Sequence, residues 1–185
     1  GFDTIELHGA HGYLLHQFMS PGINNRDDEY GKDLAKFGVE VIEAVKSVMP
    51  EDMPLLLRMS AIEYMDGGYT IDHALKMARR FKEAGVDVFH VSTGGEGDPG
   101  SLRPKRNPGF QVTYARTFKE ELDVPVIAVG KLHHPHLAEA VLGNEDADLI
   151  AIGRGMLNDP YWALHAMKEI TGKVTPPKQY VRGIR

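Results

Sequence analysis

The chain has 185 residues, of which 42% are hydrophobic and 25% charged, and its formal net charge is -5 at pH 7. This composition indicates one globular domain or part of one, and the acidic balance argues against nucleic acid or a membrane surface as a partner. Because the sequence has no cysteine, it cannot hold a disulfide framework, a thiolate metal site or a cysteine nucleophile. We therefore expect small molecules, or another copy of the chain, as partners.

No apolar run approaches the length of a membrane span, and the first residues lack the basic and then apolar pattern of a signal peptide. We expect a cytoplasmic location. Gly1 leads almost at once into a predicted strand and no start methionine precedes it, so we expect the sequence to be a segment of a longer protein.

A glycine-spaced turn directly after the first predicted strand carries His8, His11 and Tyr13. Two imidazoles and a phenol can therefore converge where this strand ends. Taken singly, each histidine also fits a solvated residue at a strand end. A metal site would need further ligands, for which His16 or Glu6 are the candidates, and we predict no metal.

Hydrophobic patterning predicts an alternation of strands and helices. Short apolar or alternating segments predict strands at 4–8, 55–60, 86–92, 124–129 and 149–152. Segments with apolar residues at helical spacing predict helices at 34–49, 71–84, 113–122, 135–142 and 160–170. The polar, turn-rich stretches 16–31 and 93–109 are predicted loops. The nearly continuous apolar run at 55–60 predicts a strand covered on both faces.

Strict alternation of β and α elements implies a parallel sheet with right-handed crossovers. An open doubly wound sheet and part of a (β/α)8 barrel both fit this pattern. The last two strands end at Gly130 and Gly153, where barrels commonly bind phosphate, and this favours the barrel. A full barrel needs roughly 250 residues, so five βα units would be its C-terminal part. We expect this partial barrel domain at 1–175 and a C-terminal arm at 176–185.

Six motifs, in order and together covering much of the chain, resemble the Old Yellow Enzyme family of FMN-dependent ene-reductases, above all its bacterial NADPH dehydrogenase branch. They are IELHGAHGYLLHQFMSP at 5–21, NNRDDEYG at 24–31, LLRMSA at 56–61, PGFQV at 108–112, IAVGKL at 127–132 and ADLIAIGRGMLNDP at 147–160. The resemblance implies that 1–175 is the FMN-binding barrel from strand four to strand eight.

The resemblance also implies an activity. It would be the NAD(P)H-dependent reduction, through FMN, of the activated C=C bond of an α,β-unsaturated carbonyl compound such as an enone. The family carries further flavin contacts in an N-terminal half of the barrel that this sequence lacks, so we expect the chain alone to be inactive. The alternative, from another class, is a non-catalytic α/β domain that binds a phosphate ligand.

Site residues follow from the matching motif positions. His8 and His11 would bind the substrate's carbonyl oxygen and stabilise the charge that develops on it, and Tyr13 would protonate the adjacent carbon. All three would therefore be catalytic residues.

Four positions would bind the cofactor: Arg58 beside the flavin ring, and Gly130, Gly153 and Arg154 at its phosphate. For Arg58 a structural ion pair with a neighbouring strand, with Glu6 as the candidate partner, is the other interpretation.

The C-terminal tail matches the form Gln-Tyr-x-Arg-Gly, which in the bacterial branch crosses a dimer interface. The resemblance therefore implies a homo-oligomer in which Arg182 reaches the substrate of a neighbouring subunit. Taken alone, the tail reads as an extended, mobile surface arm.

Several other groups receive lesser assignments. Lys131 is expected near the phosphate, and the turn at 93–95 beside the flavin. Lys105 and Arg106 read as loop charges near a cofactor phosphate, and the histidine-rich segment 133–136 as a solvated turn.

Overall fold

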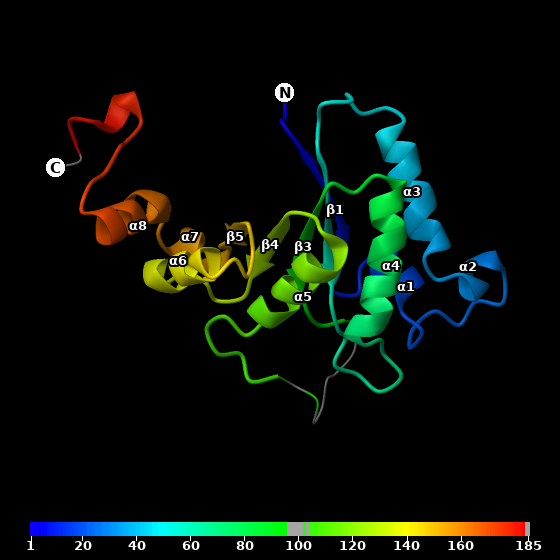
Figure 1. The fold of residues 1–185 in the computed structure, drawn as a ribbon. Helices are drawn as coiled ribbons and strands as arrows, with labels where there is room; N and C mark the ends of the chain where they lie inside the picture. Colours follow the sequence, from blue (N-terminus) through cyan, green and yellow to red (C-terminus); the bar gives the residue numbers. More distant parts are fainter. Residues whose placement is uncertain (96–101, 103, 184–185) are drawn as a thin grey trace.

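One parallel sheet organises the chain, whose computed structural model describes residues 1–95, 102 and 104–183 (Figure 1). The strand order is β1-β2-β3-β4-β5. The strands are β1 Ile5–Gly9, β2 Leu55–Ser60, β3 Val88–Ser92, β4 Val126–Val129 and β5 Leu149–Ala151. Each strand pairs with the next one along the chain, as consecutive strands of a barrel do, whereas a doubly wound sheet reverses its order. The open doubly wound alternative is therefore wrong.

Helices follow every strand. They are α1 Leu14–Met19, α2 Glu29–Lys32, α3 Lys36–Lys46, α4 Ile71–Ala84, α5 Val112–Leu122, α6 Pro135–Gly143, α7 Arg154–Asn158, α8 Trp162–Thr171 and the 3-10 turn η2 Lys178–Tyr180. The five predicted helices correspond to α3, α4, α5, α6 and α8. Part of the loop predicted at 93–109 and the last two residues of the tail lie outside the described residues.

The short helices α1, α2 and α7 were not predicted. The segment 16–31 was expected to be a surface loop, yet it contains the end of α1 and most of α2. His16 of α1 is 0% exposed, so a polar residue occupies a position on the buried stripe of the helix. The side chain of Asp28 caps α2 by accepting a hydrogen bond from the Tyr30 backbone at 3.1 Å. Helices this short owe their stability to such contacts rather than to a repeating apolar pattern.

Helix ends follow the predicted signals only in part. Gly85 and Gly172 end α4 and α8 in the left-handed conformation, with φ of 119° and 71°, which glycine adopts without strain. Thr70 occupies the N-cap position of α4, but its side chain makes no capping hydrogen bond. Thr70 thus has the extended backbone of an N-cap residue but does not cap the helix with its side chain.

The two faces of the sheet differ. Leu55, Leu57 and Met59 of β2 are buried beneath the helices, while Leu56 and Arg58 on the opposite face are only half-buried. The expectation of a strand covered on both faces is thus wrong for the described chain. Alternating burial of this kind gives the sheet an outer apolar face against the helices and an inner face that carries polar groups.

Close packing of α3 against α4 yields a stability prediction. A Cβ at Gly38 would come within 2.6 Å of the buried ring of Phe81. Gly38→Ala should therefore lower the free energy of unfolding by about 1–3 kcal/mol, measured by urea denaturation, because the ring cannot move without repacking. Gly143→Ala is the control, since a Cβ there meets nothing within 4 Å. Equal midpoints for the two variants would contradict this account of the helix contact.

The C-terminal segment lies beyond β5, at the far end of the sheet from β1 (Figure 1). It was expected to be extended, but η2 and a turn in which the Gly183 N–H donates to the Tyr180 carbonyl make it compact between 178 and 183. The ring of Tyr180 packs edge-on against Tyr161, with centroids 6.1 Å apart. Among the helices that the structure describes, none is long and apolar enough to cross a bilayer.

Candidate active site

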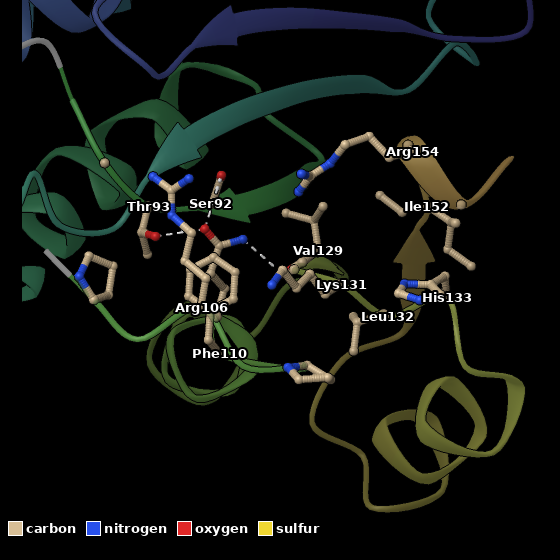
Figure 2. Close-up of a pocket in the computed structure, with 18 of the residues that line it drawn as sticks. Ser92, Thr93, Arg106, Phe110, Val129, Lys131, Leu132, His133, Ile152 and Arg154 are labelled. Carbon is tan, nitrogen blue, oxygen red and sulfur yellow. Dashed lines mark hydrogen bonds between the residues drawn. The ribbon is translucent and has the colours of Figure 1, made fainter. Parts of the chain in front are cut away.

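The carboxyl ends of the strands open onto one pocket of about 1230 Å³ (Figure 2). Each strand, or the loop that follows it, contributes to the wall of this pocket: His11 after β1, Arg58 on β2, Ser92 on β3, Gly130 after β4 and Arg154 after β5. Parallel strands all end at the same edge of a sheet, which is why residues so distant in sequence meet here.

The structure brings the three residues of the first turn together. His8 and His11 meet edge-on with ring centroids 5.4 Å apart, and the Tyr13 ring lies 4.9 Å from that of His8. His11 lines the pocket, and its Nε2 is 2.8 Å from the Ser92 hydroxyl oxygen. His8 and Tyr13 stand beside His11 rather than in the pocket wall itself. The three rings thus form one cluster, which reaches the pocket through His11.

Both histidines of this turn favour the neutral form. Burial, followed by the charge of Arg58, lowers the pKa of His11 from 6.5 to about 4. The same two causes lower the pKa of His8. A neutral imidazole still donates one hydrogen bond. The pair can therefore act as two uncharged donors toward an oxygen atom at neutral pH when His11 Nε2 accepts from the Ser92 hydroxyl and Nδ1 carries the proton.

The lowered pKa of His11 can be measured directly. In an NMR titration His11 should titrate near pH 4, and Arg58→Met should raise that pKa, because it removes a nearby positive charge. The control Arg79→Met, in an exposed arginine of α4, should not. Since the unfolded chain binds this proton near pH 6.5, the free energy of unfolding should fall as pH drops from there toward 4. A His11 pKa of 6.5 would contradict the environment described.

Arg58 stands between His8 and His90 at one level of the inner sheet face, as the strand register requires. The alternative interpretation, an ion pair between Arg58 and Glu6, is not seen among the described residues, because Glu6 Oε2 lies 2.8 Å from His90 Nδ1. Arg58 Nε is buried with no hydrogen-bond partner among the described residues. Since Arg58 also lines the pocket, its unused donor and its charge are available to a ligand.

The part of the pocket formed by the ends of β4 and β5 carries positive side chains and glycines, whose backbone is not covered by a side chain. Gly130 has a φ of 134°, a conformation that favours glycine, and a Cβ at Gly153 would meet nothing within 4 Å. Arg154 points from the end of β5 into the pocket, and Lys131 approaches from the end of β4 (Figure 2). Guanidinium and ammonium groups beside accessible backbone suit an anion such as phosphate. The predicted phosphate residues are thus brought together.

Gln111 is a structural residue of the site to which sequence reasoning assigned no role. It is buried; its Nε2 donates to the Val129 carbonyl at 2.9 Å, and its Oε1 accepts from the Thr93 hydroxyl at 2.6 Å. It thereby ties the end of β4 to the end of β3. The motif PGFQV at 108–112 was the available signal, but its role appears only when the strands are paired.

Two basic groups treated as peripheral also line the pocket. His133 is exposed, as the predicted solvated turn requires, yet it lines the cavity (Figure 2). Its carbonyl accepts a hydrogen bond from the Trp162 side chain at 2.7 Å. Arg106 lines the pocket beside the turn at 93–95, as expected, whereas Lys105 does not.

Arg182 is not part of this pocket. It is exposed, in the turn that follows η2, and does not line the cavity. Its expected role concerns a neighbouring subunit and stays a prediction. No group of three or more metal-ligating side chains occurs in the described ranges, since His16 faces Glu63 and Glu6 faces His90.

Solved structures of larger proteins share this fold. The first is 2-naphthoyl-CoA reductase in complex with 2-naphthoyl-CoA, with a TM-score of 0.82 and 22% identity over 94% of this chain and 27% of that one. Histamine dehydrogenase from Rhizobium sp. 4-9 gives a TM-score of 0.75 and 25% identity over 93% and 25% of the two chains. The fold is therefore part of a (β/α)8 barrel of the kind found in flavin oxidoreductases.

Sequence relatives identify the family. Residues 1–172 match the NADH:flavin oxidoreductase / NADH oxidase family, and the chain belongs to it. It is 42% identical to the NADPH dehydrogenases of Geobacillus thermodenitrificans, over 100% of its length, and Bacillus subtilis, over 99%. An NADH oxidase of Thermoanaerobacter brockii is 43% identical over 87% of the chain. These matches confirm the family resemblance carried by the motifs. The chain spans 54% of each of the two NADPH dehydrogenases and 26% of the NADH oxidase.

Proposed function

We propose that the chain is the C-terminal part of an FMN-dependent NAD(P)H oxidoreductase that reduces the activated C=C bond of α,β-unsaturated carbonyl compounds. The observation that carries the proposal is the pocket lined by neutral His11, with neutral His8 beside it, and by Arg58 and Arg154. The family membership favours this over a non-catalytic phosphate-binding domain. An N-terminal half-barrel would complete the site, and we call the joined protein the complete barrel.

The residues present fit FMN. Arg58 offers a buried, unpartnered N–H and a positive charge for an electron-rich ring, while Gly130, Gly153 and Arg154 offer backbone and a guanidinium for the phosphate. FMN, when bound, supplies hydride transfer from NAD(P)H to a carbon-carbon double bond.

The histidine turn would act on the substrate itself. His8 and His11 would each donate a hydrogen bond to the carbonyl oxygen, where negative charge develops as the β-carbon receives hydride. A neutral imidazole can stabilise that charge by donating a hydrogen bond, and it keeps its proton while it does so. The Tyr13 hydroxyl would donate the proton to the α-carbon.

The activity is tested by producing the complete barrel and supplying 2-cyclohexen-1-one with NADPH in the absence of oxygen. We expect a yellow protein with flavin absorbance, consumption of NADPH, and cyclohexanone as the product. A colourless protein, or one that oxidises NADPH only with oxygen and leaves the enone unchanged, would overturn the proposal.

We further propose that the complete barrel is a homo-oligomer in which Arg182 contacts the substrate of a neighbouring subunit. The exposed position of Arg182, outside the pocket of its own chain, is compatible with that role. Deleting residues 179–185 should raise the KM for 2-cyclohexen-1-one several-fold and leave the FMN content unchanged, while the control Lys178→Ala should leave both unchanged. Full activity in a strict monomer would rule out this arrangement.

A further inference from the structure

A buried carboxylate joins the loops around the histidine turn. Glu63, in the loop between β2 and α4, is 3% exposed. It accepts hydrogen bonds from His16 Nε2 at 3.1 Å, the Ser20 hydroxyl at 2.8 Å and the Tyr69 backbone N–H at 2.8 Å. Burial raises the pKa of Glu63, but the bonds from His16, Tyr69 and Ser20 outweigh it and hold the pKa below its usual value. The group is therefore an ionised, fully bonded carboxylate.

His16 is fixed between this carboxylate and the backbone of the active-site turn. It is 0% exposed, and its Nδ1 accepts a hydrogen bond from the Gly12 N–H at 2.9 Å. A ring nitrogen that accepts carries no proton, so the proton of neutral His16 is on Nε2, which donates to Glu63. The two contacts thus select one tautomer and one ring orientation.

The backbone that His16 holds is strained. His11 has a φ of 58° and Gly12 a φ of 79°, so two successive residues are left-handed and the first of them has a side chain. Non-glycine residues keep this conformation only when their surroundings enforce it. The His16 contact to Gly12 and the Gln17 side-chain contact to the Gly12 carbonyl at 2.7 Å provide such enforcement.

Glu63 also abuts a third loop. A Cβ at Gly95, in the segment after β3, would come within 2.8 Å of Glu63 Oε1, and Glu63 itself lines the pocket. The loops after β1, β2 and β3 therefore all pack on one carboxylate. Glu63 therefore contacts His16, which holds the turn that carries His11, and also lines the pocket that His11 faces.

We propose that His16 and Glu63 form a positioning pair that holds His11 in the strained conformation needed to direct its imidazole into the pocket. Neither is assigned contact with a substrate. The inference rests on the proposed function for its kinetic consequence. Loosening the pair should weaken binding of a carbonyl or phenolate oxygen and slow reduction of the alkene, while FMN binding and flavin reduction by NADPH persist.

Two substitutions separate the contacts of His16. In His16→Asn the amide oxygen can take the place of Nδ1 and still accept from Gly12, whereas His16→Leu loses both contacts. In the complete barrel, the Kd for 4-nitrophenol should rise about 10-fold or more in His16→Leu, the effect of losing one oriented donor. His16→Asn, which keeps the Gly12 contact and loses the one to Glu63, should show a loss of affinity smaller than that of His16→Leu. Both should retain the rate of flavin reduction by NADPH.

Gly38→Ala, destabilised on the outer face, controls for a general loss of stability and should bind 4-nitrophenol normally. Unchanged affinity in His16→Leu would overturn the inference, as would a loss of affinity that Gly38→Ala shares.

A second measurement does not depend on the proposed reaction. In ¹⁵N NMR spectra of the unsubstituted chain, His16 should be protonated at Nε2 and unprotonated at Nδ1. The opposite tautomer, or a mixture, would overturn the positioning pair whatever the complete barrel catalyses. If the tautomer is as expected but the complete barrel neither binds flavin nor reduces an enone, the proposed function has failed and the pair stands.

Discussion

Arg154→Ala in the complete barrel should weaken FMN binding by about 10- to 100-fold, because a charge-assisted bond to phosphate contributes roughly 1.5–3 kcal/mol. The guanidinium points into the pocket from the end of β5, beside the glycine backbone of Gly153. Removing it leaves Lys131 as a point charge, which cannot reproduce the two-pronged contact of an arginine. The measurement is a fluorescence titration of the flavin-free protein with FMN.

Arg79→Ala is the matched control. Arg79 lies on the outer helix α4 and pairs with the exposed Glu121, so its loss should leave FMN affinity within about 2-fold, as for an ordinary surface pair. Riboflavin, which lacks the phosphate, should bind the Arg154→Ala and unsubstituted proteins alike. Equal FMN affinity in the Arg154→Ala and Arg79→Ala variants would refute the placement of the phosphate.

His8→Ala and His11→Ala should each slow enone reduction by about 100-fold or more, the range found for removal of one donor to a developing oxyanion. The flavin should still be reduced by NADPH, because that half-reaction needs no hydrogen bond to the enone oxygen. Rapid-mixing experiments that follow the two half-reactions separately give both numbers. Tyr13→Phe should likewise spare reduction by NADPH and slow only the step that needs a proton.

The control for the histidine variants is His165→Ala. His165 is on α8, exposed and paired with Asp159 at 2.7 Å, and its substitution should change neither half-reaction. The assignment of the turn fails if His8→Ala and His11→Ala bind 4-nitrophenol with unchanged affinity and reduce the enone at the rate of His165→Ala.

The sequence predicted the sheet because strand signals are local. In β2 the observed bounds, Leu55–Ser60, equal the predicted ones. A short apolar run between a proline and a polar loop is too short for a helix and has clear limits at both ends. The helix ends at Gly85 and Gly172 could also be predicted from a local signal, because only glycine adopts the left-handed backbone conformation there without strain. The helices α1 and α7 escaped prediction because tertiary contacts, rather than periodicity, hold them.

The site was predictable only where a motif carried the information. His8, His11 and Tyr13 are close in sequence, so one turn suffices to bring them together, and Arg154 follows a glycine at a strand end. Other functional contacts join residues far apart: His16 meets Glu63 across 47 positions, and Gln111 reaches Val129 across 18. No local pattern encodes such pairs, and the contact between His90 and Glu6 was accordingly not predicted.

A crystal structure of the complete barrel with FMN and 4-nitrophenol tests the central claim most directly, because the claim is that one pocket holds an oxygen ligand at one end and a phosphate at the other. The account predicts the phenolate oxygen within hydrogen-bonding distance of both His8 and His11, the flavin ring beside Arg58, and the phosphate on Arg154 and the backbone of Gly130 and Gly153. A phosphate bound elsewhere, or a phenolate that contacts neither histidine, would contradict it.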